Sequence, residues 1–392
     1  MADARTLTGE ALAGALRECR ARTRAWTFDL SDAQWRVPRQ AGVNLVAWEL
    51  SHLAWFGEFW VLRGPHAVDA NGHVQAAVPA RIAGPDALFD SARLAHIARW
   101  SVALPTRDEI DARLDAQLEA CLAALAASRD SDEALYFHRL ALFHEDMHGE
   151  ALTYMRQTLG YSMPFAQRLP ARAGDTEDVE VPGGPFVQGS PRDDAFVFDN
   201  EKWAHEVVLR PARMARHCVS NAAFAAFVDA GGYRDSQWWS EEGRAWLHTE
   251  PRAHPARWRK VDDGWEQRWF GQWERLQADA PVCHVNAYEA EAYCRWAGRR
   301  LPGEAEWERA ATLGLIDWGG SVWEWTADAF VPYPGFFADR YRDYSQPWFQ
   351  THRSVRGGAF VTRPRMHHPR YRNFYLPHRR DIFVGFRTCA PD

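Results

Sequence analysis

The chain has 392 residues, of which 46% are apolar and 25% are charged, and its formal net charge is −6. This composition is typical of a globular protein with two domains, and the absence of a basic tract or charged tail argues against a nucleic-acid partner. The longest apolar stretch, 46–62, is interrupted by Glu49, His52 and Glu58, so we expect no membrane span.

Two further features bear on the cellular compartment. The N-terminal residues carry charge throughout and lack the apolar centre of a signal peptide. The six cysteines are scattered along the chain without CxxC spacing, which argues against a disulfide framework and against a structural zinc site. We therefore expect a protein of the reducing cytoplasm.

The first part of the chain has the pattern of helices. Apolar residues recur at three- and four-residue spacing in five segments: 8–28, 45–62, 86–101, 107–127 and 131–159. This spacing predicts amphipathic helices, and Ser31 and Thr106 stand where N-caps are expected. Long helices separated by proline and glycine breaks predict an antiparallel four-helix bundle.

The second part of the chain has a different pattern. After a polar linker at 164–180 the segments become short and rich in glycine and proline, and most tryptophans occur after residue 200. Two helices are expected here, at 221–230 and 287–297. The sequence therefore predicts an α+β protein with a helical domain at 1–168 and a second domain at 169–392.

Three histidines form a candidate metal site. His144 and His148 are four residues apart, so they lie on one face of the predicted helix. His52 lies in an apolar, aromatic stretch, where an unpaired imidazole would be costly to bury. Three imidazoles resemble the facial triad of non-haem iron oxygenases, with histidine in place of the carboxylate. They would also suit zinc, and each histidine by itself is compatible with an ordinary hydrogen-bonded role.

The same segment offers a second interpretation. His144, Glu145 and His148 match the HExxH pattern of zinc proteases, in which the glutamate is a general base. The residues that follow, GEALTYMRQTLGY, lack the metzincin continuation, which disfavours a protease. Glu150 is a candidate acceptor for a ligand imidazole, with a structural ion pair as the alternative.

Several segments of the second part carry a family resemblance. They include RLPGEAEWERAA at 300–311, WEWTAD at 323–328 and RGGAF at 356–360. These segments resemble the formylglycine-generating-enzyme domain, which has a C-type-lectin-like fold and in related proteins often binds a structural Ca²⁺. The reactive site of that enzyme class is a copper-binding cysteine pair near the C-terminus. Residues 366–387 contain no cysteine, so we do not expect formylglycine-generating activity.

A DinB-like bundle with a histidine set, fused to this domain, resembles the ergothioneine-type sulfoxide synthases over essentially the whole chain. The resemblance implies an enzyme that uses iron(II) and dioxygen to join a sulfur donor to the imidazole of hercynine (trimethylhistidine). It implies that His52, His144 and His148 are the iron ligands. A non-catalytic module that only binds a ligand is the alternative from a different class of function, and the sequence makes no prediction of oligomeric state.

The resemblance also implies substrate contacts and a proton donor. The contacts fall in one segment: Arg372, Asn373, Phe374 and Tyr375. Asn373 and Phe374 correspond to the site for the trimethylammonium group, which an aromatic face attracts by about 0.5–2 kcal/mol. The proton-donating tyrosine of the family corresponds to Tyr341, with Tyr344 as the alternative and a packing role as the alternative for either.

Two departures from the family pattern concern the donor. Synthases that use γ-glutamylcysteine typically have glutamine in place of Met147 and aspartate in place of Tyr375. A donor with two carboxylates and an amine needs charged partners, so these replacements favour a neutral, hydroxyl-rich donor. The pattern most resembles the selenoneine synthase branch, which implies 1-seleno-β-D-glucose as the donor, with γ-glutamylcysteine or cysteine as the alternative. Arg99, in the segment 88–100, is a candidate carboxylate contact, with a surface or interdomain salt bridge as the alternative.

Overall fold

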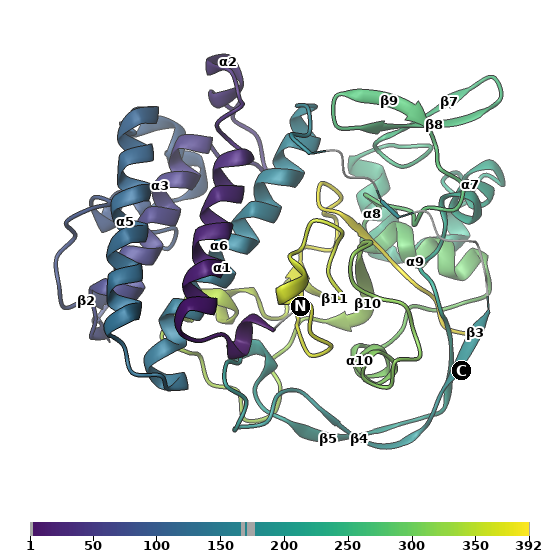
Figure 1. The fold of residues 1–392 in the computed structure, drawn as a ribbon. Helices are drawn as coiled ribbons and strands as arrows, with labels where there is room; N and C mark the ends of the chain where they lie inside the picture. The colour runs from purple at the N-terminus through teal and green to yellow at the C-terminus, as the bar shows by residue number, and fades with distance from the viewer. Residues whose placement is uncertain (1–2, 166–168, 171–176, 392) are drawn as a thin grey trace. The chain divides into compact units, whose positions relative to one another are not determined.

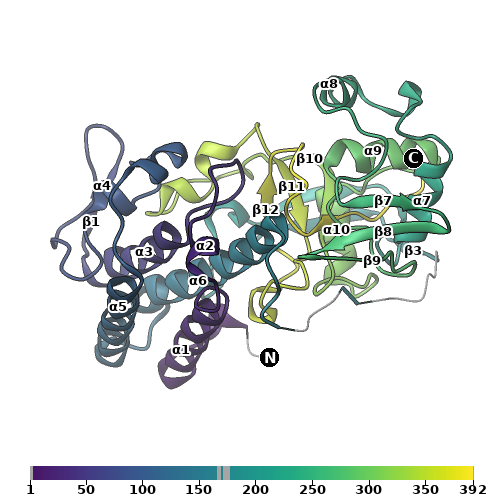
Figure 2. The same cartoon turned by 90° about the horizontal axis from the view of Figure 1, so that it is seen from above.

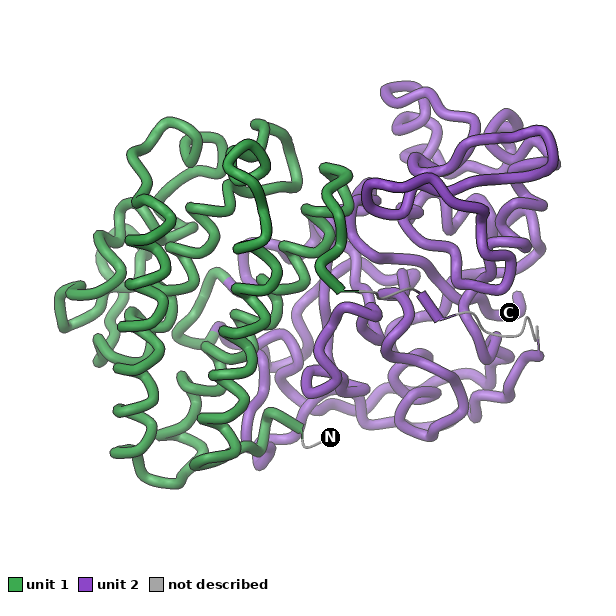
Figure 3. Tube along the Cα trace, turned by 45° about the horizontal axis from the view of Figure 1, so that its top comes forward, with its two compact units in different colours: residues 1–165, 339–343 green, residues 166–338, 344–392 purple. Residues whose placement is uncertain are grey.

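The computed structural model describes residues 3–165, 169–170 and 177–391. The chain separates into two compact units (Figure 3), one of residues 1–165 with 339–343 and the other of residues 166–338 with 344–392. The predicted domain boundary lies between residues 168 and 169, and residues 166–168 are outside the described part of the chain. The assignment of 339–343 to the first unit was not predicted, because nothing in the local sequence of this segment indicates a helical partner.

The first unit is a bundle of long helices (Figures 1 and 2). Its four long helices are α1 (Gly9–Ala25), α3 (Val46–Gly57), α5 (Arg107–Ala127) and α6 (Asp132–Leu159). Helices α1 and α3 each pack against both α5 and α6, which confirms the predicted bundle. Thr106 begins α5 with a capping box, and Gly160, at φ 71°, ends α6 in the left-handed conformation that favours glycine.

Shorter elements complete this unit. They are the 3-10 helix Ala4–Thr6, α2 (Asp32–Trp35), a π-helical turn Glu58–Leu62 that continues α3, the strands β1 (His66–Val68) and β2 (Val74–Ala76), α4 (Asp86–Phe89) and the 3-10 helix His96–Ser101. Strands β1 and β2 pair as an antiparallel hairpin.

The prediction of one continuous helix over 86–101 is wrong. The structure has only the single turn of α4 and the separate 3-10 helix. The carboxylate of Asp90 accepts a hydrogen bond from the backbone N–H of Ala92 at 2.9 Å. Such a local bond offers the backbone an alternative to helical hydrogen bonds, and the helix ends there.

The second unit combines small sheets with short helices (Figure 1). Its strands are β3 (Asp178–Val181), β4 (Gly184–Gln188), β5 (His205–Leu209), β6 (Ala212–Ala215), β7 (Trp258–Val261), β8 (Gly264–Trp269), β9 (Gln272–Arg275), β10 (Trp323–Ala329), β11 (Arg353–Arg356), β12 (Asn373–Tyr375) and β13 (Val384–Gly385). A four-stranded sheet has the order β12-β11-β10-β13. The strands β3 with β6, β4 with β5, and β7 to β9 form smaller antiparallel sheets.

Four α-helices are described in this unit: α7 (Asn221–Asp229), α8 (Glu241–Thr249), α9 (Ala287–Trp296) and α10 (Glu304–Thr312). The predictions at 221–230 and 287–297 are confirmed by α7 and α9, whereas α8 and α10 were missed. Each of the missed helices has 9 residues. Trp307 on α10 is fully buried and packs in the core of this unit.

Within the described part of the chain, no helix has both the length and the apolar character required to cross a membrane.

Candidate metal centre

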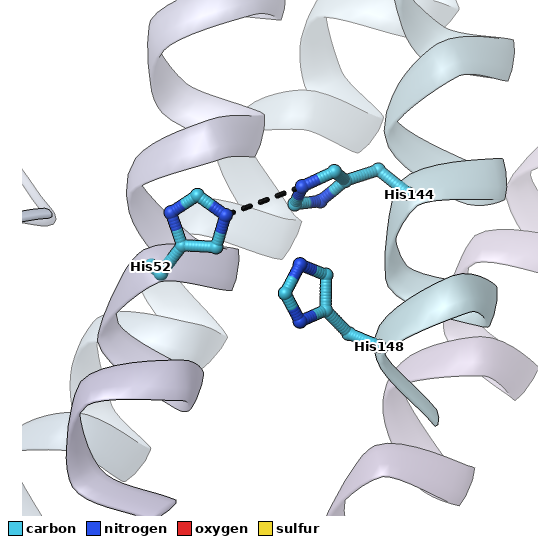
Figure 4. A group of neighbouring side chains, drawn as sticks. All are labelled: His52, His144 and His148. Atoms are coloured by element: carbon cyan, nitrogen blue, oxygen red, sulfur yellow. Dashed lines mark hydrogen bonds between the residues drawn. The ribbon is translucent and has the colours of Figure 1, made fainter. Parts of the chain in front are cut away.

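The three predicted histidines come together in the first unit (Figure 4). His52 projects from α3, and His144 and His148 project from successive turns of α6. One ring nitrogen of each lies within 4.8 Å of the others, and the Nε2 atoms of His52 and His144 are 3.3 Å apart. His52 and His144 are 3% and 6% exposed. Among the described residues, this is the one such group of three or more metal-ligating side chains.

Hydrogen bonds on the outer nitrogens fix the tautomers of two rings. His52 donates from Nδ1 to the carbonyl of Phe89 at 2.7 Å, and His148 donates from Nδ1 to Oε1 of Glu49 at 2.8 Å. Both partners only accept hydrogen bonds, so each Nδ1 carries a proton and Nε2 is the nitrogen available to a metal. This is the usual arrangement of histidines that bind a metal.

The carboxylate partner of the centre is Glu49, which sequence reasoning missed. The sequence suggested Glu150 for this role; Glu150 is a buried residue of α6, and the carboxylate that accepts the hydrogen bond from His148 is that of Glu49. The sequence feature that could have indicated Glu49 is its position three residues before His52 in an apolar helix. Residues three apart share a helix face, so an acid there lies near the ligand.

The electrostatics of the centre favour a bound cation. Burial lowers the pKa of His52 and of His144 well below the ordinary value, and the neighbouring His148 lowers both further. These rings are therefore neutral and can donate a lone pair. Burial by itself would raise the pKa of Glu49, but its interaction with His148 outweighs this effect and the carboxyl pKa lies below its ordinary value. The neutral rings of His52 and His144, together with His148 on its ionised carboxylate partner, fit a divalent metal such as iron(II) or zinc.

Aromatic rings hold the planes of two ligand imidazoles. Trp48 stacks on His52 with ring centroids 4.9 Å apart and an interplanar angle of 10°. Phe56 stacks on His144 at 3.5 Å and 4°. Packing of this kind restricts ring rotation, so the nitrogen donors are positioned before a metal binds.

Of the two candidate tyrosines, the structure places Tyr341 beside the histidines. Tyr341 belongs to the segment 339–343 of the first unit. Its ring centroid lies 6.2 Å from that of His144 and 5.1 Å from that of Phe56. Tyr344 belongs to the second unit, where it stacks on Phe198 at 4.9 Å. This geometry favours Tyr341 as the residue near the metal centre.

Arg99 is buried in the first unit, with only 8% of its surface exposed. Its Nη1 donates to Oδ1 of Asn44 at 2.6 Å, and its guanidinium carbon lies 3.5 Å from the ring centroid of Trp48. Burial lowers its pKa to about 10, so the guanidinium is still charged at neutral pH. It forms no salt bridge with the described residues, which disfavours the alternative of a surface or interdomain ion pair.

Arg372 has a structural position in the second unit. It is 0% exposed, and its Nε and Nη2 donate to the Glu304 carboxylate at 2.7 and 3.0 Å. It also donates to the carbonyls of Asn200 and Val331, and its guanidinium carbon lies 3.9 Å from the ring centroid of Tyr333. These hydrogen bonds show that Arg372 holds β12 in place, and its expected contact with substrate stays a prediction.

The other residues of this segment lie on β12 and are half-buried. Phe374 stacks on Phe330 with centroids 4.1 Å apart at 15°. Asn373 donates from Nδ2 to the hydroxyl of Tyr375 at 3.2 Å, and the guanidinium of Arg379 lies 5.5 Å from the Tyr375 ring centroid. These side chains form a polar and aromatic group in the second unit.

Comparisons with known proteins cover both units. Residues 15–153 match the DinB superfamily, and residues 166–313 and 311–391 match the sulfatase-modifying factor enzyme 1-like domain. A hercynine oxygenase of Mycolicibacterium smegmatis is 31% identical over 97% of this chain and 98% of its own length. One of Mycobacterium tuberculosis is 32% identical over the same shares.

A formylglycine-generating enzyme of Thermomonospora curvata is 37% identical, but the match covers 37% of this chain and 52% of that protein. The similarity to hercynine oxygenases therefore includes the histidine-bearing bundle, whereas the similarity to formylglycine-generating enzymes is partial. The chain belongs to the ergothioneine-type sulfoxide synthase family and is an iron-dependent oxidoreductase.

Proposed function

We propose that this protein joins hercynine to a selenosugar, 1-seleno-β-D-glucose, in an iron(II)- and oxygen-dependent reaction of selenoneine biosynthesis in the cytoplasm. The relatives that match nearly the whole chain are hercynine oxygenases, which supports hercynine as one substrate. The observation that carries the proposal is the cluster of His52, His144 and His148 with Tyr341 beside it.

In this proposal the three histidines hold iron(II). When bound, the iron supplies activation of dioxygen and a positive centre that favours the anionic form of a selenol or thiol. The protein orients two of the nitrogen ligands, because the Phe89 carbonyl accepts a hydrogen bond from His52 and the Glu49 carboxylate accepts one from His148. The aromatic rings stacked on His52 and His144 shield the buried side of the centre from water.

Tyr341 is the proposed proton donor. Its ring contacts those of Phe56 and Trp60 at centroid distances of 5.1 and 5.7 Å, which limits its rotation. Tyr136 holds the same segment by donating from its hydroxyl to Oδ2 of Asp339 at 2.9 Å. A positioned phenol of this kind can release and recover one proton at its oxygen during turnover.

The proposed contacts for the trimethylammonium group are Asn373 and Phe374. Phe374 belongs to a group of rings that includes Phe330, Tyr344 and His352. Aromatic faces are the usual partners of quaternary ammonium groups. The proposal therefore assigns hercynine recognition to β12 and its aromatic neighbours.

Two residues support the selenosugar as donor. Met147 and Tyr375 stand where synthases for γ-glutamylcysteine typically carry glutamine and aspartate, and the Tyr375 hydroxyl is already within hydrogen-bond distance of Asn373. These uncharged side chains suit a hydroxyl-rich donor better than a charged peptide. An ergothioneine-type synthase that uses γ-glutamylcysteine or cysteine is the second candidate, because the whole-length relatives are hercynine oxygenases.

A competition experiment tests the choice of donor. The iron-loaded protein is given hercynine and oxygen with equal concentrations of 1-seleno-β-D-glucose, γ-glutamylcysteine and cysteine, and the products are measured by mass spectrometry. We expect the carbon–selenium product to predominate. Predominance of a carbon–sulfur product would contradict the selenosugar but keep the oxygenase activity, and the absence of any hercynine adduct would contradict both.

A further inference from the structure

The segment that carries Tyr341 is irregular. Residues 339–341 lie outside every described helix and strand, and a short 3-10 helix, Arg342–Tyr344, follows them. The segment 339–343 nevertheless belongs to the first unit, with the helices of the bundle. The hydrogen bonds of a regular element therefore do not fix residues 339–341, and contacts with side chains of the bundle carry more of that role.

Helix α6 supplies two of these contacts. Tyr136 donates from its hydroxyl to Oδ2 of Asp339 at 2.9 Å, and the guanidinium carbon of Arg340 lies 6.0 Å from the ring centroid of Phe137. Residues seven apart share a helix face, so Phe137 and His144 lie on one face of α6, about 10 Å apart along its axis. Successive residues of the segment therefore contact α6 on the side that leads to a metal ligand.

A second path runs from α6 to Tyr341 through aromatic rings. Phe137 stacks on Trp60 with centroids 5.3 Å apart at 26°, and Trp60 meets Tyr341 edge-on at 5.7 Å. Two residues of chain span at most about 7 Å, so a fixed Asp339 confines the backbone of Tyr341 to a small region. The hydrogen bond from Tyr136 thus limits where the backbone of Tyr341 lies, and Trp60 limits where its ring turns.

We propose that Tyr136 is a positioning residue for the reaction: its hydrogen bond to Asp339 holds the Tyr341 hydroxyl where proton transfer requires it. This inference rests on the proposed function, in which Tyr341 donates the proton. Catalysis depends steeply on the placement of the reacting groups, and a displacement of about 1 Å can cost up to about 100-fold in rate. Loss of the bond should therefore slow the reaction through Tyr341 while substrate and metal binding stay intact.

The experiment uses four variants of the iron-loaded, full-length protein. Tyr136→Phe removes the hydroxyl but keeps the ring, and Asp339→Ala removes the acceptor, whereas Asp339→Asn keeps an oxygen acceptor. Tyr161→Phe is the matched control, because it also removes one tyrosine hydroxyl and lies two residues after the end of α6. Turnover is measured with hercynine and the donor preferred in the competition experiment, and each substitution is then repeated in a Tyr341→Phe background.

We expect Tyr136→Phe to lower kcat by about 10-fold, with the KM for hercynine and the iron(II) affinity unchanged. Asp339→Ala should match it, and Asp339→Asn should lose less. In the Tyr341→Phe background Tyr136→Phe should have no further effect, because residues that act through one group are not additive. Amide hydrogen exchange at 339–343 should rise in Tyr136→Phe and stay unchanged in Tyr161→Phe.

Full kcat in a folded Tyr136→Phe protein would overturn the inference. An equal loss in the wild-type and Tyr341→Phe backgrounds would also overturn it, because Tyr136 would then act by another route. The same holds for a loss seen only in KM or in iron affinity, and for unchanged exchange at 339–343. These results leave the proposed function intact.

If Tyr341→Phe by itself retains full turnover, the proposed proton donor is excluded and the positioning role is overturned with it. If no form of the protein converts hercynine, the proposed function is overturned. If Tyr136→Phe does not fold, the same cycle with Asp339→Ala and Tyr341→Phe decides the question, since Asp339 lies in an irregular segment and not in a helix of the bundle.

Discussion

His148 donates a hydrogen bond from Nδ1 to Oε1 of Glu49 at 2.8 Å, across 99 positions of sequence and between two helices of the bundle. This bond directs the Nε2 lone pair of His148 toward His52 and His144. It also places a buried negative charge directly behind a nitrogen donor, where it offsets part of the charge of a bound metal. A facial triad has a carboxylate among its metal ligands. Here the carboxylate of Glu49 instead accepts a hydrogen bond from one of the ligand histidines.

Replacement of Glu49 tests this role. Glu49→Ala should weaken iron(II) binding by about 10- to 100-fold, the usual loss when an outer partner of a ligand histidine is removed. Glu49→Gln retains an oxygen acceptor and should lose less. Anaerobic iron titration is the measurement, and Glu133→Gln, an exposed position at the start of α6, is the control. An unchanged affinity in a folded Glu49→Ala protein would contradict the assigned role.

The buried histidines predict how the stability of the metal-free protein depends on pH. In the unfolded chain, histidines take up protons below about pH 6.5, whereas burial lowers the pKa of His52 and His144 well below that value in the folded protein. The unfolded state therefore binds more protons as the pH falls. The free energy of unfolding should fall with it, by up to about 1.4 kcal/mol per pH unit for each such histidine.

Urea unfolding of the metal-free protein at pH 7, 6 and 5 measures this decline. The His52→Asn variant lacks one of the two groups, so its decline should be shallower than that of the wild-type protein. Identical slopes for the two proteins would show that His52 is protonated equally in the folded and unfolded states.

Tyr341→Phe tests the proton donor. The variant keeps the ring and its contacts with Phe56 and Trp60 but loses the hydroxyl. We expect kcat to fall by about 100-fold, as is typical when a positioned proton donor is removed, with iron affinity unchanged. Steady-state oxygen consumption with hercynine and the donor is the measurement, and Tyr161→Phe is the control. Full turnover by Tyr341→Phe would exclude the phenol from the reaction.

Phe374→Leu tests the contact with the trimethylammonium group. Loss of the aromatic face should raise the KM for hercynine by roughly 5- to 30-fold, which corresponds to about 1–2 kcal/mol, and should change kcat little. Phe349→Leu is the control, because Phe349 packs on the same partner, Phe330, at 4.8 Å. If the two variants raise KM equally, the effect comes from packing and not from a cation–π interaction.

The sequence was sufficient for the parts of the site that depend on local periodicity. The four-residue spacing of His144 and His148 fixes a common helix face, and the two capped starts at Ser31 and Thr106 are confirmed in the structure. The apolar stretch around His52 likewise predicts a buried imidazole. Each of these inferences uses residues that are close in sequence, where helix geometry determines which side chains meet.

The parts that were missed depend on distant contacts. Glu49 meets His148 only because α3 and α6 pack together, and neither helix by itself specifies that pairing. The Phe89 carbonyl reaches His52 because the chain turns at Asp90, where a continuous helix was expected. Such contacts depend on tertiary packing, which local patterns in a single sequence do not predict.

The contacts of Arg372 in the second unit were likewise not predicted from the local sequence. Its predicted role in substrate binding can be tested. Its position within Arg-Asn-Phe-Tyr suggested a substrate contact, but its guanidinium is fully buried against Glu304. Arg372→Lys cannot form the paired hydrogen bonds of the planar guanidinium. We expect it to lower the free energy of unfolding by about 3 kcal/mol, near the cost of breaking a buried ion pair.

Urea unfolding of the metal-loaded protein measures this loss, with Arg379→Lys as the control at a partly exposed ion pair with Asp381, where the cost should be under about 1 kcal/mol. In Arg372→Lys protein that is still folded, the KM for hercynine should change less than in Phe374→Leu. A stable Arg372→Lys protein with a large increase in KM would support Arg372 as a substrate contact. That result would mean that β12 rearranges when substrate binds, because the guanidinium would have to leave Glu304 to reach it.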